Sequence, residues 1–70
     1  MDGITKNYSR TLTRKERATM ELLIEGKRDK EIALLLCVAP RTIGQRIAVV
    51  CDKLGALNRV QAAVMFAKLQ

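Results

Sequence analysis

Hydrogen-bonding side chains gather in one short segment of this 70-residue chain. Residues 39 to 47 read APRTIGQRI, in which Arg41, Gln45 and Arg46 surround Gly44. A glutamine amide both donates and accepts, so it can pair with the N6 and N7 atoms of adenine, and arginine carries a permanent positive charge that attracts phosphate. These residue types predict recognition of nucleic acid.

Catalytic chemistry has few candidate residues. The chain contains no histidine, no cluster of carboxylates and no glycine-rich phosphate loop, so we expect no enzyme activity. Cys37 and Cys51 lie in apolar stretches without a CxxC pair, so we expect no metal site and no cofactor. Both thiols are expected to be buried, in a protein of a reducing compartment such as the cytoplasm.

The charge balance favours a polyanionic partner. Thirteen basic residues against seven acidic ones give a net charge of +6 and an isoelectric point near 9.9. DNA, RNA and anionic lipid all fit this charge, and a basic excess also occurs on surfaces that serve only solubility. No apolar run approaches the roughly 20 residues of a membrane span. With DNA as the expected partner, we expect association with the nucleoid.

The elements that position these residues are predicted to be four helices. Residues 1–11 lack periodicity and are expected to form a polar arm, and residues 12–70 are expected to form one all-α domain. A short second helix, a turn of about three residues and a longer third helix with arginines near its start are typical of the helix-turn-helix motif.

Capping residues set the expected helix boundaries. Thr13 and Glu16 form a capping box at the start of the first helix. Asp29 is the expected N-cap of the second, Pro40 suits the first turn of the third, and Asn58 is the expected N-cap of the fourth. The predicted helices then cover about 14–25, 29–37, 40–54 and 58–69.

The third helix is expected to turn an apolar stripe inward and a polar face outward. Ile43, Ile47, Val50 and Leu54 recur at helical spacing and form the stripe. The outward face then carries Arg41, Gly44, Gln45, Ala48 and Asp52, with Arg46, Val49 and Lys53 at its edges.

Gly44 is the least expected residue on this outward face. A glycine inside a helix costs about 1 kcal/mol relative to alanine. Close approach would explain it, because Gly44 and Ala48 let the backbone lie near base edges in a major groove while Gln45 and Arg41 reach the bases. The alternative is a neutral surface glycine.

Four residues are expected to contact phosphate. They lie in the first turns of the second and third helices, where free backbone N–H groups favour an anion, or beside the outward face. Any one of them could instead be a solvated polar or charged side chain. The four residues are Lys30, Thr42, Arg46 and Lys53.

The stretch from residue 12 to residue 64 resembles the LuxR/GerE/FixJ-type helix-turn-helix domain of bacterial regulators. The resemblance implies a four-helix domain that binds double-stranded DNA as a dimer, with the third helix in the major groove and the fourth at the dimer contact. It also implies that Glu16 pairs with Arg59. The matching residues are Leu12-Thr13, Glu16-Arg17, Leu23, Gly26, Lys30-Glu31-Ile32-Ala33, Leu36, Thr42-Ile43, Lys53-Leu54-Gly55, Arg59 and Ala62-Ala63.

The chain departs from this family pattern in three places. Ala39 stands where the family usually has a capping Ser or Thr, a loss of about 1 kcal/mol. Gly44 and Arg46 replace residues that are often Lys and His, so the base preference of a relative does not transfer. Leu34 and Leu35 replace polar residues, and are expected to be exposed or to be covered by Ile4 and Tyr8 of the arm or by a partner protein.

The fourth helix is apolar on nearly every side, which predicts burial on two faces. Ala62, Ala63, Phe66 and Ala67 are expected to close the domain, and a monomer with an exposed apolar C-terminus is the alternative to a homodimer. The predicted dimer contact consists of Gln61, Val64, Met65 and Lys68.

Two functions remain open. The first is a transcriptional regulator, either an activator or a repressor, that binds a pseudo-palindromic operator. For this function we expect a complete small protein, and an excised output domain of a larger regulator is the alternative. The second is a protein-interaction module that docks on RNA polymerase or a larger regulator through Leu34, Leu35 and helix 58–69.

Overall fold

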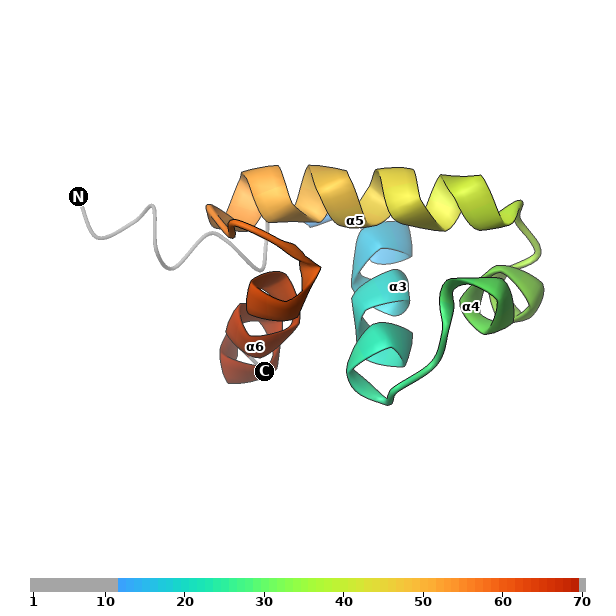
Figure 1. Ribbon diagram of the computed structural model, residues 1–70, viewed down its shortest axis with the longest axis horizontal. Helices are drawn as coiled ribbons and strands as arrows, with labels where there is room; N and C mark the ends of the chain where they lie inside the picture. Colours follow the sequence, from blue (N-terminus) through green and yellow to red (C-terminus); the bar gives the residue numbers. More distant parts are fainter. Residues whose placement is uncertain (1–11, 70) are drawn as a thin grey trace.

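A computed structural model describes residues 12–69, so the expectations for the arm of residues 1–11, including Ile4 and Tyr8, lie outside the described part. Over this range the chain forms four helices and no strand, which confirms the predicted all-α class (Figure 1). The helices are α3 (Arg14–Ile24), α4 (Asp29–Leu36), α5 (Pro40–Leu54) and α6 (Arg59–Leu69).

Helix α5 lies across the other three helices. Figure 1 shows it along the long axis of the molecule, with α3, α4 and α6 on one side of it, and it packs against all three. Helices α4 and α5 are bent by 102° at the break between them. One side of α5 therefore faces the core along its whole length, and the other faces away from the rest of the domain.

The core forms where the buried stripe of α5 meets the inner faces of the other helices. Ile43, Ile47, Val50 and Leu54 are each at most 2% exposed, which confirms the predicted stripe. Each fully buried aliphatic side chain stabilises the fold by about 1.5–3 kcal/mol. The stripe packs with Leu12, Met20, Ile32, Ala33, Ala62 and Phe66.

Two of the predicted helix caps are confirmed by their hydrogen bonds. At α3, the Glu16 backbone N–H donates to Thr13 Oγ1 at 3.1 Å, and the Thr13 N–H donates to Glu16 Oε1 at 2.9 Å. At α6, the Gln61 N–H donates to Asn58 Oδ1 at 2.8 Å. The Gln61 side chain accepts from the Leu57 N–H at 2.6 Å.

The predicted N-cap of α4 is wrong by one residue. Arg28 has the extended backbone of an N-cap, and Asp29 is the first helical residue. The Arg28 N–H donates to Glu31 Oε1 at 2.8 Å. Asp29 makes a different contact, because its carboxylate binds Arg59 on α6.

The helix ends differ from expectation at Cys37. Gly26 and Gly55 take positive φ values of 92° and 72°, as a glycine stop after a helix requires. Cys37 also adopts the left-handed conformation, with φ 60°, at the C-cap of α4. Its thiol is exposed and that of Cys51 is only partly buried, so the prediction of two buried cysteines is wrong. The cause is the turn after α4, which places residue 37 at the surface.

Candidate nucleic-acid interface

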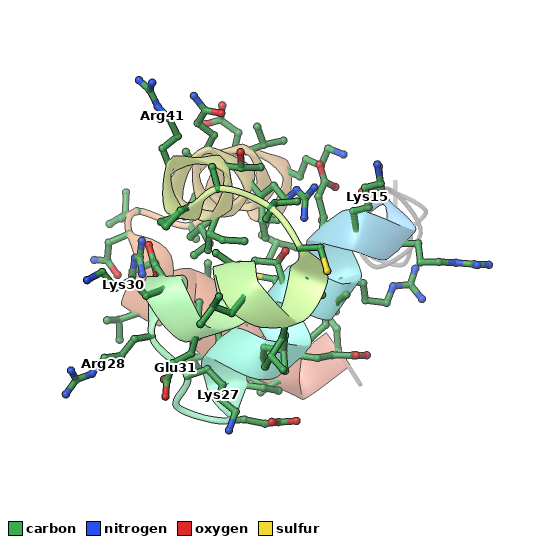
Figure 2. The ribbon with its side chains drawn as sticks, turned by 90° about the vertical axis from the view of Figure 1, so that its right-hand side faces the viewer. Lys15, Lys27, Arg28, Lys30, Glu31 and Arg41 are labelled. Carbon is green, nitrogen blue, oxygen red and sulfur yellow. The ribbon has the colours of Figure 1, made fainter. Side chains whose placement is uncertain are left out.

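The outward face of α5 is the candidate surface for nucleic acid. Its residues are small or polar because the apolar stripe occupies the opposite side of the helix. Figure 2 views α5 nearly end-on and shows Arg41 projecting away from the other helices. Arg41, Gln45, Ala48 and Asp52 are exposed, and Gly44 is partly buried at the edge of this face.

Packing inside the domain does not require a glycine at position 44. A Cβ added to Gly44 would meet no atom within 4 Å outside its immediate helical surroundings. The helix therefore forgoes the favourable propensity of alanine without any steric gain within residues 12–69.

The N-terminus of α5 lacks a side-chain cap. Ala39 is the N-cap, makes no side-chain hydrogen bond, and is followed by Pro40 at the first helical position. The Thr42 N–H donates to the Ala39 carbonyl at 3.0 Å. Exposed helix N-termini of this kind carry a partial positive charge that favours anions.

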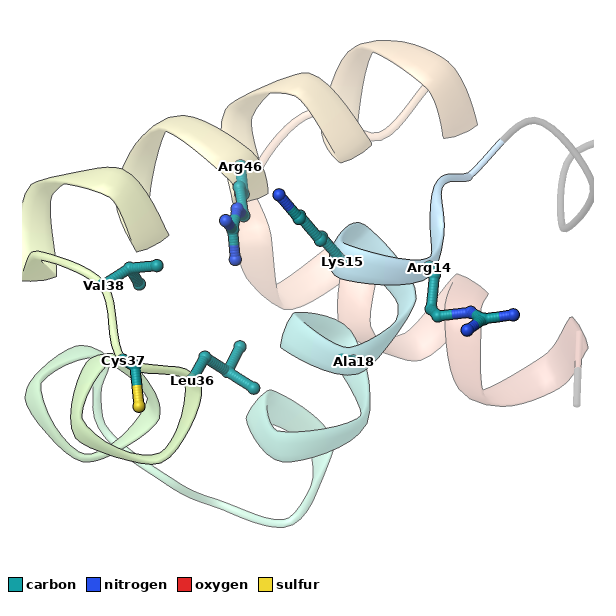
Figure 3. A pocket seen from close by; sticks show the side chains of 7 residues that line it. All are labelled: Arg14, Lys15, Ala18, Leu36, Cys37, Val38 and Arg46. Atoms are coloured by element: carbon teal, nitrogen blue, oxygen red, sulfur yellow. The ribbon is translucent and has the colours of Figure 1, made fainter.

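The four residues predicted to contact phosphate lie on both flanks of α5. Lys30 is exposed on α4, on one side of α5 in Figure 2. Arg46 is partly buried along the opposite flank of α5, which faces the start of α3 (Figure 3), and Thr42, also partly buried, precedes it by one helical turn on the same side. Lys53 lies on this flank too, but its Nζ is 2.8 Å from Glu16 Oε1, so its charge is partly balanced within the domain.

The Lys53–Glu16 ion pair replaces the pair implied by the family resemblance. The side chain of Glu16 is only 11% exposed, and burial by itself raises the pKa of this carboxyl. The hydrogen bonds from Lys53 and the Thr13 backbone, with the charge of Lys53, outweigh burial and hold the pKa of Glu16 below its ordinary value. The predicted Glu16–Arg59 pair is therefore wrong, because the last turn of α5 supplies the cation.

Arg59 instead joins α6 to α4. Its Nη1 and Nη2 atoms donate to the two carboxylate oxygens of Asp29 at 2.7 and 3.0 Å. This two-point hydrogen bond lowers the pKa of Asp29 and raises the pKa of Arg59. The pair fixes the starts of α4 and α6 relative to each other.

Helix α6 keeps an apolar face in solvent. Ala62 and Phe66 are buried, as predicted, but Ala67 is exposed and Met65 packs partly against the core. These two differences have one cause: α6 is rotated so that the line from Ala62 to Phe66, rather than Ala67, points inward. Of the predicted dimer contacts, Gln61, Val64 and Lys68 are exposed.

Sequence reasoning missed two exposed apolar residues beside Val64. Leu57 is 87% exposed and Val60 is 70% exposed. With Val64 they recur at three- and four-residue spacing, the signal that could have identified them. Val60 and Val64 line a shallow groove of about 250 Å³ together with Leu23, Arg59 and Ala63.

The two leucines of α4 that depart from the family pattern are exposed, and the expected cover by Ile4 and Tyr8 lies outside the described residues. Leu34 is 81% exposed and Leu35 is 58% exposed. Leu34 borders a groove of about 220 Å³ that Lys30, Ala33, Val38 and Pro40 also line.

The described residues also bear on metal binding and on membrane insertion. Within residues 12–69, no three side chains of His, Cys, Asp or Glu come together as a metal site would require. Among the described helices, none is individually long and apolar enough to cross a membrane, and only the bent α4–α5 pair reaches that length and composition together.

The short helix α4, the turn at residues 37–39 and the outward-facing α5 define a helix-turn-helix DNA-binding domain. Residues 10–66 match the family model GerE, described as bacterial regulatory proteins of the luxR family. The chain belongs to this family and is a DNA-binding domain of a transcription regulator.

Three curated relatives give the extent of the similarity. The spore germination protein GerE of Bacillus subtilis (strain 168) is 42% identical over 53 residues, which cover 76% of this chain and 72% of GerE. The transcriptional regulatory protein DesR of the same strain is 37% identical over 51 residues, or 73% of this chain. The glycerol metabolism activator of Pseudomonas putida is 33% identical over 60 residues, or 86% of this chain.

The relatives differ in length. This chain spans only 26% of DesR and 27% of the glycerol metabolism activator, so it matches one part of each. No solved structure matches the chain significantly.

Proposed function

We propose that the chain binds a pseudo-palindromic operator in double-stranded DNA as a homodimer, with the N-terminal half of α5 in the major groove. One observation carries this proposal: over its first half the outward face of α5 has no large aliphatic side chain, its residues Arg41, Gln45 and Ala48 are exposed, and among residues 12–69 a Cβ at Gly44 would meet no atom within 4 Å outside its own helical surroundings. Bare Gly44 and Ala48 let the helix backbone approach base edges. Gln45 and Arg41 then reach the bases.

The phosphate contacts set affinity rather than sequence preference. Lys30 lies on one flank of α5, and Arg46 lies on the other, with Thr42 one helical turn before it. Lys53 is the weakest of the four candidates, because it already binds Glu16. A dimer with about 6–10 phosphate contacts would lose roughly 10³ to 10⁵ in affinity between 50 and 200 mM salt.

The homodimer is supported by the exposed apolar face of α6. Leu57 and Val60 extend the predicted contact of Gln61, Val64, Met65 and Lys68, and the groove beside them is lined mostly by apolar side chains. A two-fold axis through this face would bring two copies of α5 to half-sites about one helical turn apart, roughly 34–36 Å.

Selection of bound duplexes from a random pool tests the proposal. A symmetric consensus with two half-sites is expected, and binding without any sequence preference would reject it. On the selected duplex, Gln45→Ala should weaken binding by about 1–3 kcal/mol. The same variant on a scrambled duplex is the control, and equal losses on both duplexes would exclude Gln45 as a base-reading residue.

A second candidate function rests on Leu34 and Leu35. Their exposure on α4, beside the groove at Lys30, suits a contact with a larger regulator or with RNA polymerase in the cytoplasm. Such a contact would decide whether the bound domain activates or represses transcription.

A further inference from the structure

A pocket of about 390 Å³ lies on the flank of α5 that faces α3. It is formed by the first turns of α3, the turn of the helix-turn-helix motif and the middle of α5 (Figure 3). Its lining residues are Arg14, Lys15, Ala18, Leu36, Cys37, Val38 and Arg46.

The pocket carries positive charge without any negative charge to balance it. Three of its lining residues are cations, and no carboxylate lines it. Among residues 12–69, the side chains of Arg14, Lys15 and Arg46 have no ion pair or hydrogen bond, in contrast to Lys53 and Arg59. The domain thus leaves these cations available for an anion from outside.

Two of the three cations converge. Figure 3 shows the Lys15 side chain extending toward α5 and the Arg46 side chain extending from α5 into the pocket, whereas the Arg14 guanidinium points away from both. Two like charges directed at one pocket repel each other, and a bound anion would remove that repulsion. Lys15 and Arg46 therefore form the anion-binding part of the pocket.

The position of the pocket suggests the source of the anion. In the view along α5, Lys15 lies on one side of the helix and Lys30 on the other (Figure 2). Arg41 points outward from α5, away from the other helices. A helix in the major groove has the phosphates of one strand on each side, across a groove about 12 Å wide. A cation on each flank matches this arrangement.

We propose that Lys15 and Arg46 together bind one backbone phosphate of DNA, on the strand opposite the one that Lys30 contacts. The inference rests on the proposed function, since it takes α5 to lie in the groove. It assigns the start of α3 to the DNA interface, so that both strands beside the groove are held.

The test compares Lys15→Ala with Lys27→Ala, a lysine that Figure 2 shows far from α5. Duplex affinity is measured against salt concentration for each variant and for the unchanged chain. Each neutralised phosphate contributes about 0.9 to the slope of log affinity against log salt, so a dimer that lacks both Lys15 and Arg46 should lose roughly 2 from its slope. Lys15→Ala alone should lose part of that amount, because Arg46 still reaches the phosphate. Lys27→Ala should keep the slope, and Lys15→Arg should restore it.

The loss should be equal on specific and scrambled duplexes, because a phosphate contact does not depend on sequence. The double variant without Lys15 and Arg46 should lose less duplex affinity than the product of the fold losses of the two single variants, because both residues bind the same phosphate. Thermal unfolding followed by circular dichroism checks that each variant folds, and Lys15→Ala should not be destabilised since it removes a cation from a helix N-terminus.

Three outcomes would overturn the inference. The first is an equal salt slope for Lys15→Ala and Lys27→Ala; the second is a loss confined to the specific duplex. The third is saturable binding of inorganic phosphate, monitored by NMR signals of Lys15 and Arg46, together with a duplex affinity that the bound phosphate does not change. The site would then serve a free anion. Failure of the unchanged chain to bind any duplex would instead reject the proposed function.

Discussion

Arg59 donates from its two terminal guanidinium nitrogens to the two carboxylate oxygens of Asp29, at 2.7 and 3.0 Å, across 30 positions of sequence. Glu16, the acidic partner that family resemblance implies for Arg59, is held instead by Lys53. The two pairs link different helices: Asp29–Arg59 joins α4 to α6, and Glu16–Lys53 joins α3 to α5. Each pair lies at helix ends, so Asp29–Arg59 links the starts of α4 and α6, and Glu16–Lys53 links the start of α3 to the end of α5.

Double-mutant cycles should separate these two pairings. Asp29→Ala and Arg59→Ala should couple by about 0.5 kcal/mol in the free energy of unfolding, a value typical of a partly exposed ion pair. Glu16→Ala and Arg59→Ala should be additive within about 0.3–0.5 kcal/mol, because they share no contact. Urea unfolding of the single and double variants measures both quantities, and coupling of Glu16 rather than Asp29 to Arg59 would contradict the structure.

Stability should fall on the acid side. The pKa values of Glu16 and Asp29 are lowered in the folded state, so both carboxyls bind fewer protons when folded than when unfolded. Their contribution is complete above the ordinary values of 4.5 and 3.8 and is lost as the pH falls through the lower folded values.

Asp29→Asn tests this pH dependence. The variant should be less stable than the unchanged chain near pH 7, and the difference should shrink as the pH falls below about 4. Asp52→Asn is the matched control, since Asp52 is exposed and has no ion pair among residues 12–69. A pH-independent difference for Asp29→Asn would show that the carboxylate charge does not contribute.

Gly44→Ala should affect stability and DNA binding in opposite directions. The free domain should gain up to about 1 kcal/mol, because alanine favours a helix and the added methyl meets no neighbour. Affinity for the selected duplex should fall if the backbone at Gly44 approaches base edges. Thermal melting and fluorescence anisotropy measure the two effects, and unchanged affinity would leave Gly44 as an ordinary surface residue.

The paired change Leu34→Ser with Leu35→Ser distinguishes a protein contact from a DNA contact. Both leucines are exposed, so the variant should fold with a stability within about 0.5 kcal/mol of the unchanged chain. DNA affinity should also stay unchanged, while transcription from an operator-bearing promoter should change if these residues contact RNA polymerase or a larger regulator. A loss of DNA affinity would place α4 in the DNA interface instead.

Local interactions could be read from the sequence with good accuracy. The period of Ile43, Ile47 and Val50 predicts which side of α5 is buried, because a helix repeats every 3.6 residues regardless of its neighbours. The caps at Thr13 and Asn58 also act within three residues of their own positions. From such terms the sequence alone determines the number of helices, their approximate limits and the polar character of the outward face of α5.

Pairings between distant residues were decided only by the tertiary structure. Lys53 and Arg59 are equally plausible partners for Glu16 in a linear chain, and only the crossing of α5 over α3 brings Lys53 to it. The same packing makes Asp29 an ion-pair partner rather than an N-cap and places Lys15 opposite Lys30 across α5. Charge complementarity says which residue types attract, but the choice of partner depends on distances of a few ångströms that packing alone sets.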